Sequence, residues 1–338
     1  MKTNYYLCMG LAAAFALTSC SKDNDSPEIP GEEGAPINFG YTFVNHSARG
    51  EVNTANLDEM KVYGFVNTPE SYIFNDTPVR KEGDSWSYAG SQYWHAGNTY
   101  YFTAIAPTDA DAGWTFSPVA PGTAAVPYVG GGSITFDTSV DGGDTDLVYA
   151  FYKVTTPTQG SYSQPVKFVF NHILSQVRFR FINNMGEGTQ LRIKNVRLDN
   201  VVNQGTIDLN AQTPAWVTVA DNYTAIVPDI ENDEMYLPNA SVTGSTEGNF
   251  IIPAISTASP MTLGFTVEVY NGSTLVGTYV HTGVALPTFD MSMGYCYNYN
   301  AGINPGNVNP NGTLNRIEFE VSKVNDWTDE EVGTPVLP

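Results

Sequence analysis

The sequence predicts an all-β protein built from two tandem β-sandwich domains. The composition is rich in Tyr (20) and Phe (17), which favour strands, and in Gly (31) and Pro (21), which favour turns. About fifteen short apolar or alternating stretches recur at spacings of roughly 8 to 12 residues, which suits sandwiches better than one barrel. No segment shows a sustained helical period. The 338 residues provide enough chain for two such domains.

The strands are predicted from apolar runs and from alternation with period two. In the first strand, Ile37, Phe39, Tyr41 and Phe43 alternate with small or polar residues and form one buried face. The other predicted strands cover residues 60–66, 78–81 and 86–88 (a hairpin around 82–84), 99–106, 147–155, 166–171, 175–183, 191–198, 206–209, 216–219, 224–227, 250–252, 261–270, 274–281, 295–301 and 317–324.

Two stretches of the chain are predicted to be connections between strands. Residues 110–132 are rich in Gly, Ala and Pro and leave room for one short strand. Residues 157–165 contain Pro, Gly, Ser and Gln and separate two clusters of predicted strands. We therefore predict an N-terminal sandwich over residues 37–160 and a C-terminal sandwich over residues 161–338.

The first 19 residues predict a lipoprotein signal peptide. They carry one charge, Lys2, then an apolar run from Leu7 to Leu17, and they lead into Leu17-Thr18-Ser19-Cys20. The run is too short for a membrane-spanning helix, which needs about 20 residues, but it fits a secretory signal. We expect cleavage before Cys20 and attachment of lipid to its thiol. The alternative is an ordinary cleaved signal followed by a chance cysteine.

The residues behind the signal peptide predict a flexible tether. Residues 20–36 contain several acidic residues, Pro and Gly, and almost nothing to bury. With Cys8 removed and Cys20 lipidated, Cys296 is the remaining cysteine. An intrachain disulfide and a metal site made of several thiolates are thereby excluded from the mature protein.

The charge balance excludes one class of partner. Fifteen Lys and Arg against 35 Asp and Glu give a formal net charge of −20, so a nucleic-acid backbone would be repelled. Asp137, Asp141, Asp144 and Asp146 crowd around two glycines, which suggests a calcium loop. Their spacing does not match an EF-hand, and we favour a solvated turn. We expect no metal and no cofactor.

The sequence offers no constellation typical of an enzyme. His46, His95, His172 and His281 lie in separate predicted elements, without the spacing of a zinc helix or a local triad. Glycosidase chemistry requires two carboxylates at a fixed distance, and the sequence pattern does not identify such a pair. We interpret His172, between apolar strands, as a structural residue.

A group of aromatic residues allows two interpretations. They could form a sugar-stacking face, or they could pack within the core and across the sheet, which is the interpretation favoured by their alternation. The group consists of Trp86, Tyr88, Tyr93, Trp94, Tyr100 and Tyr101.

Several stretches together resemble the fimbrillin-like family, the pilins and accessory subunits of type V pili in Bacteroidales. The acidic residues behind Cys20 also resemble the export signal that sends lipoproteins of these bacteria to the outer face of the outer membrane. The alternative is a tether that carries no export signal. The stretches that carry the family resemblance are Ser47-Ala48-Arg49-Gly50, Tyr93-Trp94-His95 before Tyr100-Tyr101-Phe102-Thr103-Ala104, Asp146-Leu147-Val148-Tyr149-Ala150, residues 168–177, and residues 317–327.

The resemblance implies a specific route of assembly. Members have two transthyretin-like sandwiches, are exported as lipoproteins, and polymerise after a trypsin-like protease cuts after an arginine behind the first strand. That strand leaves, and a strand from another subunit fills the groove. A sandwich lacking one strand exposes unpaired backbone groups and apolar surface, and an added strand satisfies both.

Carried over to this sequence, the resemblance assigns roles to particular residues. Arg49, followed by Gly50, is the expected cleavage point, and Ile37, Phe39, Tyr41 and Phe43 belong to the strand that leaves. The candidate donor strand contains Ile317, Phe319 and Val321. The alternative is that this strand pairs within its own sheet.

The expected partners are other fimbrial subunits, the outer membrane through the lipid on Cys20, the protease, and a receptor on a host or bacterial surface. Stalk, tip and anchor roles all remain open. A glycan-binding surface lipoprotein is the second hypothesis, and a hydrolase is the third.

Overall fold

The computed structural model describes residues 34–40, 42–44, 52–67, 70–109, 111–119, 131–211, 213–254, 259–308 and 317–324. The described residues belong to one compact unit. In the described part, the helices are a single α-turn, α1 (Thr138–Asp141), and a 3-10 turn, η1 (Glu231–Asp233). The predicted all-β fold class is confirmed.

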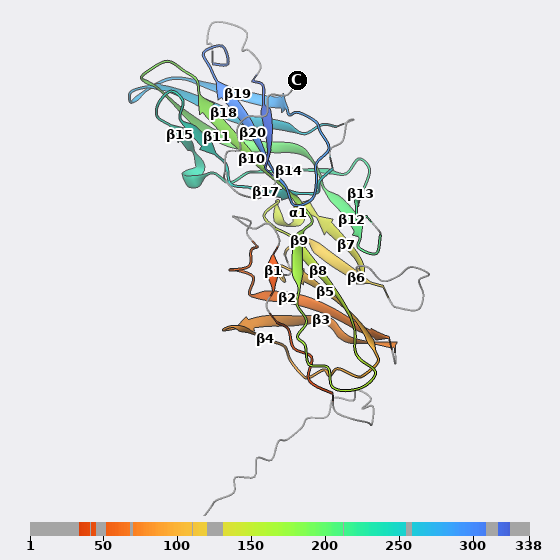
Figure 1. Ribbon diagram of the computed structural model, residues 1–338. Coiled ribbons are helices and arrows are strands. Elements are labelled where there is room, and N and C mark those ends of the chain that lie inside the picture. Colours follow the sequence, from red (N-terminus) through yellow and green to blue (C-terminus); the bar gives the residue numbers. More distant parts are fainter. Residues whose placement is uncertain are drawn as a thin grey trace, which may run out of the picture. The chain divides into compact units, whose positions relative to one another are not determined.

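A seven-stranded sheet contains most of the first half of the chain (Figure 1). Its pairs are antiparallel, except that β1 runs parallel to β9. In spatial order its strands are β1 (Phe43–Val44), β9 (Val169–His172), β8 (Val148–Thr155), β5 (Thr99–Ala106), β2 (Glu59–Asn67), β3 (Glu70–Glu82) and β4 (Ser85–Ser87).

The sequence predicted β5 with its observed bounds, and it predicted the hairpin between β3 and β4. Gly83 adopts a φ of +63° in that turn, a conformation that glycine reaches without strain. β3 begins earlier than predicted because Asn75, Asp76 and Thr77 interrupt the apolar alternation. At this point β2 and β3 shift register, and Asp76 has a φ of +51°.

One face of the seven-stranded sheet buries an aromatic-rich core. Phe74, Tyr100 and Phe102 stand on its strands, and Ile37 and Phe39 reach the same core from the N-terminal end of the described chain. These rings pack mainly edge to face, for example Phe39 against Phe74 with centroids 5.5 Å apart. This core therefore depends on residues that precede the first long strand.

A four-stranded sheet brings together both halves of the chain. Its order is β13 (Trp216–Thr218), β12 (Gln204–Asp208), β7 (Gly132–Asp137) and β6 (Trp114–Pro118). β7 was not predicted because only Ile134 and Phe136 in it are apolar. Both are fully buried, in a cluster that also contains Ile105 and Ile207.

The predicted domain boundary lies in a connection within one sheet. Residues 157–165 link β8 to β9, and these two strands pair with each other. The core side chains change cluster later in the chain: Phe170 belongs to the first core, Ile173 and Leu174 to the cluster under the four-stranded sheet, and Val177 to the next core.

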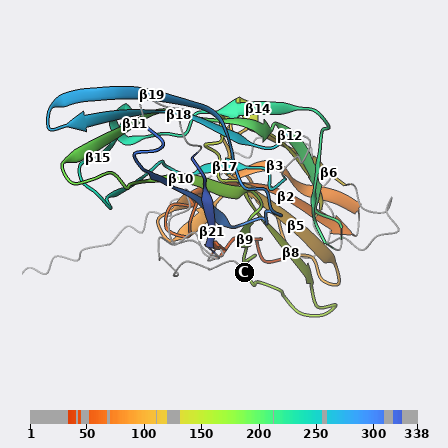
Figure 2. The same ribbon diagram turned by 90° about the horizontal axis from the view of Figure 1, so that it is seen from above.

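The second half of the chain forms a β-sandwich of two five-stranded sheets (Figure 2). Phe179, Phe181 and Tyr299 of one sheet pack with Leu191 and Phe265 of the other. The first sheet contains β16 (Thr243–Ser245), β10 (Ser175–Asn183), β20 (Cys296–Ile303) and β21 (Glu320–Val324), and β17 (Asn249–Ile251) also pairs with β10. The second sheet contains β14 (Tyr223–Ile226), β11 (Thr189–Val202), β18 (Thr262–Asn271) and β19 (Thr274–Ala285), and β15 (Met235–Leu237) also pairs with β11.

Within the described residues, no helix is long and apolar enough to cross a membrane.

Candidate functional site

The first described segment, residues 34–44 without Tyr41, lies along an edge of the seven-stranded sheet; we call it the leading segment. Its first half runs antiparallel to the stretch before β5. The Ile37 amide donates to the Gln92 carbonyl at 2.7 Å, and the Trp94 amide donates to the Ala35 carbonyl at 2.9 Å. The Tyr88 hydroxyl donates to the Ile37 carbonyl at 2.8 Å. These bonds hold one side of the leading segment.

The other side of the leading segment runs parallel to the stretch that enters β9. The Gly40 amide donates to the Val166 carbonyl, and the Val166 amide donates to the Asn38 carbonyl, both at 2.8 Å. β1 then continues the pairing against Val169 and Phe170. The segment thus pairs on both sides, but through isolated bridges and one two-residue strand rather than a long ladder.

Side-chain packing also attaches the leading segment to the sheet. Ile37 is fully buried, and Phe39 is 4% exposed. The Phe39 ring contacts four others, with centroids at 5.5 Å (Phe74), 5.7 Å (Tyr88), 6.4 Å (Phe102) and 5.8 Å (Phe168). Burying a phenylalanine among rings contributes about 1.5–3 kcal/mol from removed apolar surface alone. Without the segment, the apolar surface beneath Phe39 would face water.

The structure describes the burial of part of the leading segment. Ile37 and Phe39 are buried as expected, and Thr42 and Val44 are also buried, although the alternation placed Thr42 on the opposite face. Tyr41 and the side chain of Phe43 lie outside the described residues.

A buried acid–histidine pair lies beside Val52, on the C-terminal side of the predicted cleavage point. His172 Nδ1 and Asp146 Oδ1 are 2.7 Å apart, and the two side chains are 1% and 0% exposed. The other carboxylate oxygen of Asp146 accepts the Val52 amide at 3.1 Å. This contact joins the residues behind the predicted cleavage point to β9, the neighbour of β1.

The sequence predicted the environment of His172 but not that of Asp146. The interpretation of His172 as a structural residue agrees with its burial. Asp146 was assigned to a solvated acidic turn, but it is fully enclosed because the Val148↔His172 pairing brings it beside the imidazole. The alternation of Leu147 and neighbouring apolar residues was the available signal that Asp146 enters a buried strand.

The rest of the acidic stretch forms the turn that was predicted. Asp137 caps α1 by accepting the Ser139 amide at 3.0 Å, and Asp141 accepts the Gly143 and Thr145 amides at 3.0 and 2.6 Å. Burial, and then the nearby carboxylates of Asp229, Asp141 and Glu247, raise the pKa of Asp144. Across the described residues, no group of three or more His, Cys, Asp or Glu is arranged to hold a metal.

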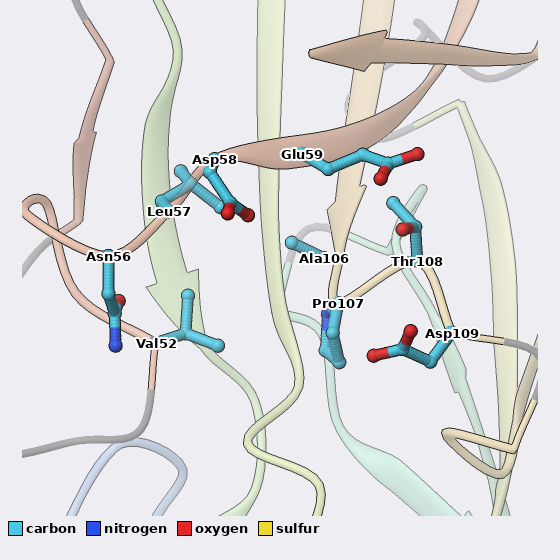
Figure 3. A pocket seen from close by; sticks show the side chains of 9 residues that line it. All are labelled: Val52, Asn56, Leu57, Asp58, Glu59, Ala106, Pro107, Thr108 and Asp109. Atoms are coloured by element: carbon cyan, nitrogen blue, oxygen red, sulfur yellow. The ribbon is translucent and has the colours of Figure 1, made fainter. Parts of the chain in front are cut away.

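A small hollow of about 170 Å³ lies beside Val52 (Figure 3). In this view, Val52 and Asn56 stand on one side, and Pro107 and Asp109 at the end of β5 stand on the other. Its volume is below the roughly 300 Å³ at which small-molecule pockets begin. The hollow is lined by Val52, which follows the predicted cleavage point in the sequence.

The candidate donor strand packs within its own sandwich. β21 pairs antiparallel with β20 at the edge of its sheet. Ile317 and Phe319 are 2% and 6% exposed, and Val321 is half-buried against the same core. The Phe319 ring lies 6.0 Å from Phe181 and 6.3 Å from Phe265. These three side chains face the core of their own sandwich, and the strand pairs within its own sheet, which was the alternative to a free donor.

Cys20, Arg49 and Gly50 lie outside the described residues, so lipidation and cleavage there stay predictions. In the aromatic group, Trp86, Trp94 and Tyr100 are buried, which agrees with core packing.

His281 is expected to make folding sensitive to acid. Burial lowers its pKa below the ordinary value of 6.5, its ring stacks on Phe265 at 5.0 Å, and its Nε2 has no partner in the described part. As the pH falls, His281 is protonated in the unfolded chain before it is protonated in the folded protein. The stability that the neutral, buried imidazole contributes is therefore fully present above the ordinary pKa and is lost as the pH falls towards the folded-state pKa.

Urea unfolding at about pH 8 and about pH 5 should consequently show a smaller acid loss in His281→Phe than in the wild type. Val280→Thr, at the exposed neighbouring position, should retain the wild-type loss. An unchanged acid loss in His281→Phe would contradict the assignment.

Comparisons with known proteins agree with this architecture. Residues 47–327 match the model of a family described as fimbrillin-like. A fimbrial protein from Bacteroides vulgatus is 18% identical, with a TM-score of 0.58 over 87% of this chain and 99% of that one. A protein from Bacteroides uniformis with a provisional cell-adhesion assignment is 16% identical, with a TM-score of 0.47 over 89% and 100%. No curated protein matches the chain.

Proposed function

The chain belongs to the fimbrillin-like family, and we propose that it is a non-enzymatic structural subunit of a cell-surface fimbria that assembles by strand exchange after proteolysis. Family membership supports the fimbrial role. The observation that carries the strand-exchange proposal is the leading segment: a short edge segment with few backbone pairs, whose buried Phe39 fills an aromatic groove.

We further propose that the precursor is a lipoprotein. The supporting pattern is the short apolar run that ends at Leu17-Thr18-Ser19-Cys20. Lipid on Cys20 would hold the precursor in the outer membrane, and the acidic residues that precede Gly34 would extend the folded part away from it. Ala35 and Pro36, which the sequence placed in the tether, pair instead with the stretch before β5.

Cleavage between Arg49 and Gly50 would separate the leading segment from the rest of the chain. A trypsin-like protease recognises the arginine side chain, and Gly50 leaves the backbone behind it uncrowded. Once cut, the segment would be retained only by its own packing and its few bonds. The Val52 amide on Asp146 would keep the new N-terminal end attached to the sheet.

A strand like Ile317–Val324 from a second subunit is suited to the opened groove. Ile317, Phe319 and Val321 place apolar side chains at i, i+2 and i+4, as the leading segment does at Ile37 and Phe39. Backbone groups of Gln92, Trp94 and Val166 would become free to pair with it. The donor would have to leave β20 of its own chain first.

Limited proteolysis tests this proposal. The delipidated protein is treated with a low dose of trypsin, the new N-terminus is sequenced, and oligomers are followed by size-exclusion chromatography. We expect Gly50-Glu51-Val52 as the new end, loss of the leading segment, and oligomers. Arg49→Gln should resist cutting and stay monomeric.

Arg80→Gln is the matched control, because Arg80 is 68% exposed elsewhere on the same sheet. It should be cut at Arg49 like the wild type. If Gly50 does not appear as an N-terminus, or if the cut protein retains the leading segment and remains monomeric, strand exchange at this site is refuted.

A further inference from the structure

A second hollow, of about 380 Å³, lies between the seven-stranded sheet and strand β6. Tyr63 of β2 and Trp114 and Phe116 of β6 supply aromatic walls, and Lys61 and Asp76 supply charged groups. Its volume falls within the roughly 300–1,000 Å³ of small-molecule sites. Strand exchange assigns no role to it, because the leading segment does not line it.

The charged groups of this hollow are held in place before any ligand arrives. Asp76 Oδ1 accepts the Tyr63 hydroxyl at 2.8 Å and lies 3.0 Å from Lys61 Nζ. The Asp76 side chain is nevertheless 54% exposed and that of Lys61 is 29% exposed. A carboxylate has about four acceptor positions and an ammonium three donors, so both keep bonding capacity towards solvent.

Burial, and then the hydrogen bond to Asp76 and its charge, raise the pKa of Tyr63. The Tyr63 hydroxyl therefore keeps its proton at neutral pH and remains the donor that orients the carboxylate.

The backbone at Asp76 also departs from ordinary strand geometry. Asp76 has a φ of +51°, and the register between β2 and β3 shifts between Val62 and Gly64, opposite this position. A non-glycine residue in this region carries strain that the surrounding structure must offset, and such residues cluster at functional sites. Bulges likewise redirect side chains beside binding sites. Here the bulge presents the Asp76 carboxylate at the hollow.

The aromatic walls are fixed by their own contacts. The Tyr63 and Phe116 rings lie 4.5 Å apart, and the Trp114 indole N–H donates to the Pro107 carbonyl at 2.9 Å. A rigid aromatic wall beside orienting polar groups suits a ligand with an apolar face and a polar rim. A pyranose ring has this character, because its C–H groups pack on rings while its hydroxyls both donate and accept.

The charge of the hollow selects among polar ligands. An anion would meet Asp76, Asp109 and a chain of net charge −20. A cationic ligand would bind over the Trp114 ring and beside the Asp76 carboxylate. The Lys61 ammonium already occupies this position, 5.6 Å from the ring centroid, and would repel a second cation. We propose that this hollow binds a neutral pyranose unit of a surface glycan. This site goes beyond fimbrial assembly and needs neither cleavage at Arg49 nor an exchanged strand.

Calorimetric titration of the full, uncut chain tests the site. The probes are oligosaccharides of glucose, galactose, mannose and N-acetylglucosamine, with sialylated and sulfated glycans alongside. We expect at least one neutral probe to bind with a Kd of about 1 mM or tighter. Losing one charged partner should weaken binding about tenfold in Asp76→Asn and in Lys61→Gln.

Asp199→Asn is the matched control, because Asp199 forms an exposed ion pair with Arg197 in the β-sandwich of the second half of the chain. It should bind like the wild type, and circular dichroism should show that all three variants are folded. Asparagine tolerates the positive φ at position 76, so that variant is expected to fold.

The proposal is overturned if no neutral probe binds at about 10 mM. It is also overturned if an acidic glycan binds best, or if folded Asp76→Asn and Lys61→Gln keep the wild-type affinity. Because the uncut monomer is used, failure of strand exchange does not affect the result.

Discussion

Phe39→Ala is expected to destabilise the uncut protein by about 3–5 kcal/mol, the usual cost of removing a buried phenylalanine ring. The ring is 4% exposed and contacts Phe74 and Phe168 among its four aromatic neighbours. The cavity would open at a sheet edge held by few backbone bonds, so the leading segment should detach more readily. Urea unfolding of the uncut chain measures the loss.

The same substitution should have no effect once the leading segment has gone. Cut and separated at Arg49, the wild-type and Phe39→Ala proteins would be identical from Gly50 onward and should unfold at the same urea concentration. Asn38→Ala, at the exposed neighbouring position, serves as the control and should change the uncut stability by less than about 0.5 kcal/mol. Equal stability of uncut Phe39→Ala and wild type would show that the segment contributes little to the fold.

Asp146→Ala should be comparably severe, at about 3–5 kcal/mol, because breaking a buried pair leaves its partner without compensation. Asp146 Oδ1 lies 2.7 Å from His172 Nδ1, and both side chains are almost completely enclosed. The Val52 amide would lose its acceptor in the same variant. Urea unfolding measures the effect, and faster proteolysis around Val52 should accompany it.

Two further variants test whether the loss of stability comes from the Asp146–His172 pair rather than from the removal of any carboxylate in this stretch. Asp137→Ala removes an exposed helix cap in the same stretch and should cost only about 1 kcal/mol. Asp146→Leu with His172→Leu replaces both partners by apolar groups and should recover much of the loss. A cost in Asp146→Ala no greater than in Asp137→Ala would contradict a stabilising role for the pair.

The fold class could be predicted because alternation and turn residues act locally. β5 and β10 were predicted with their observed bounds, since each is a clean apolar or alternating run. β7 and β16 were missed because they contain few apolar residues, and β15 was missed because its apolar run is only three residues long; each pairs with a distant strand. Such pairing depends on tertiary contacts rather than on intrinsic strand preference.

The site could be predicted in part. Apolar alternation identified the leading segment and β21, but not the burial of Thr42 in the leading segment. The contact between Asp146 and His172 depends on the register between β8 and β9, which no local pattern encodes. The Lys61, Asp76 and Trp114 hollow likewise arises where β2, β3 and β6 meet.

The mixed origin of the four-stranded sheet limits how the polypeptide can be divided. β7 hydrogen-bonds to β12, so a truncated protein ending at residue 160 would lack β9, β12 and β13 and would leave the edges of β8 and β7 bare. Bare edges above Ile134 and Phe136 invite self-association. Expressing either half by itself should therefore yield insoluble material.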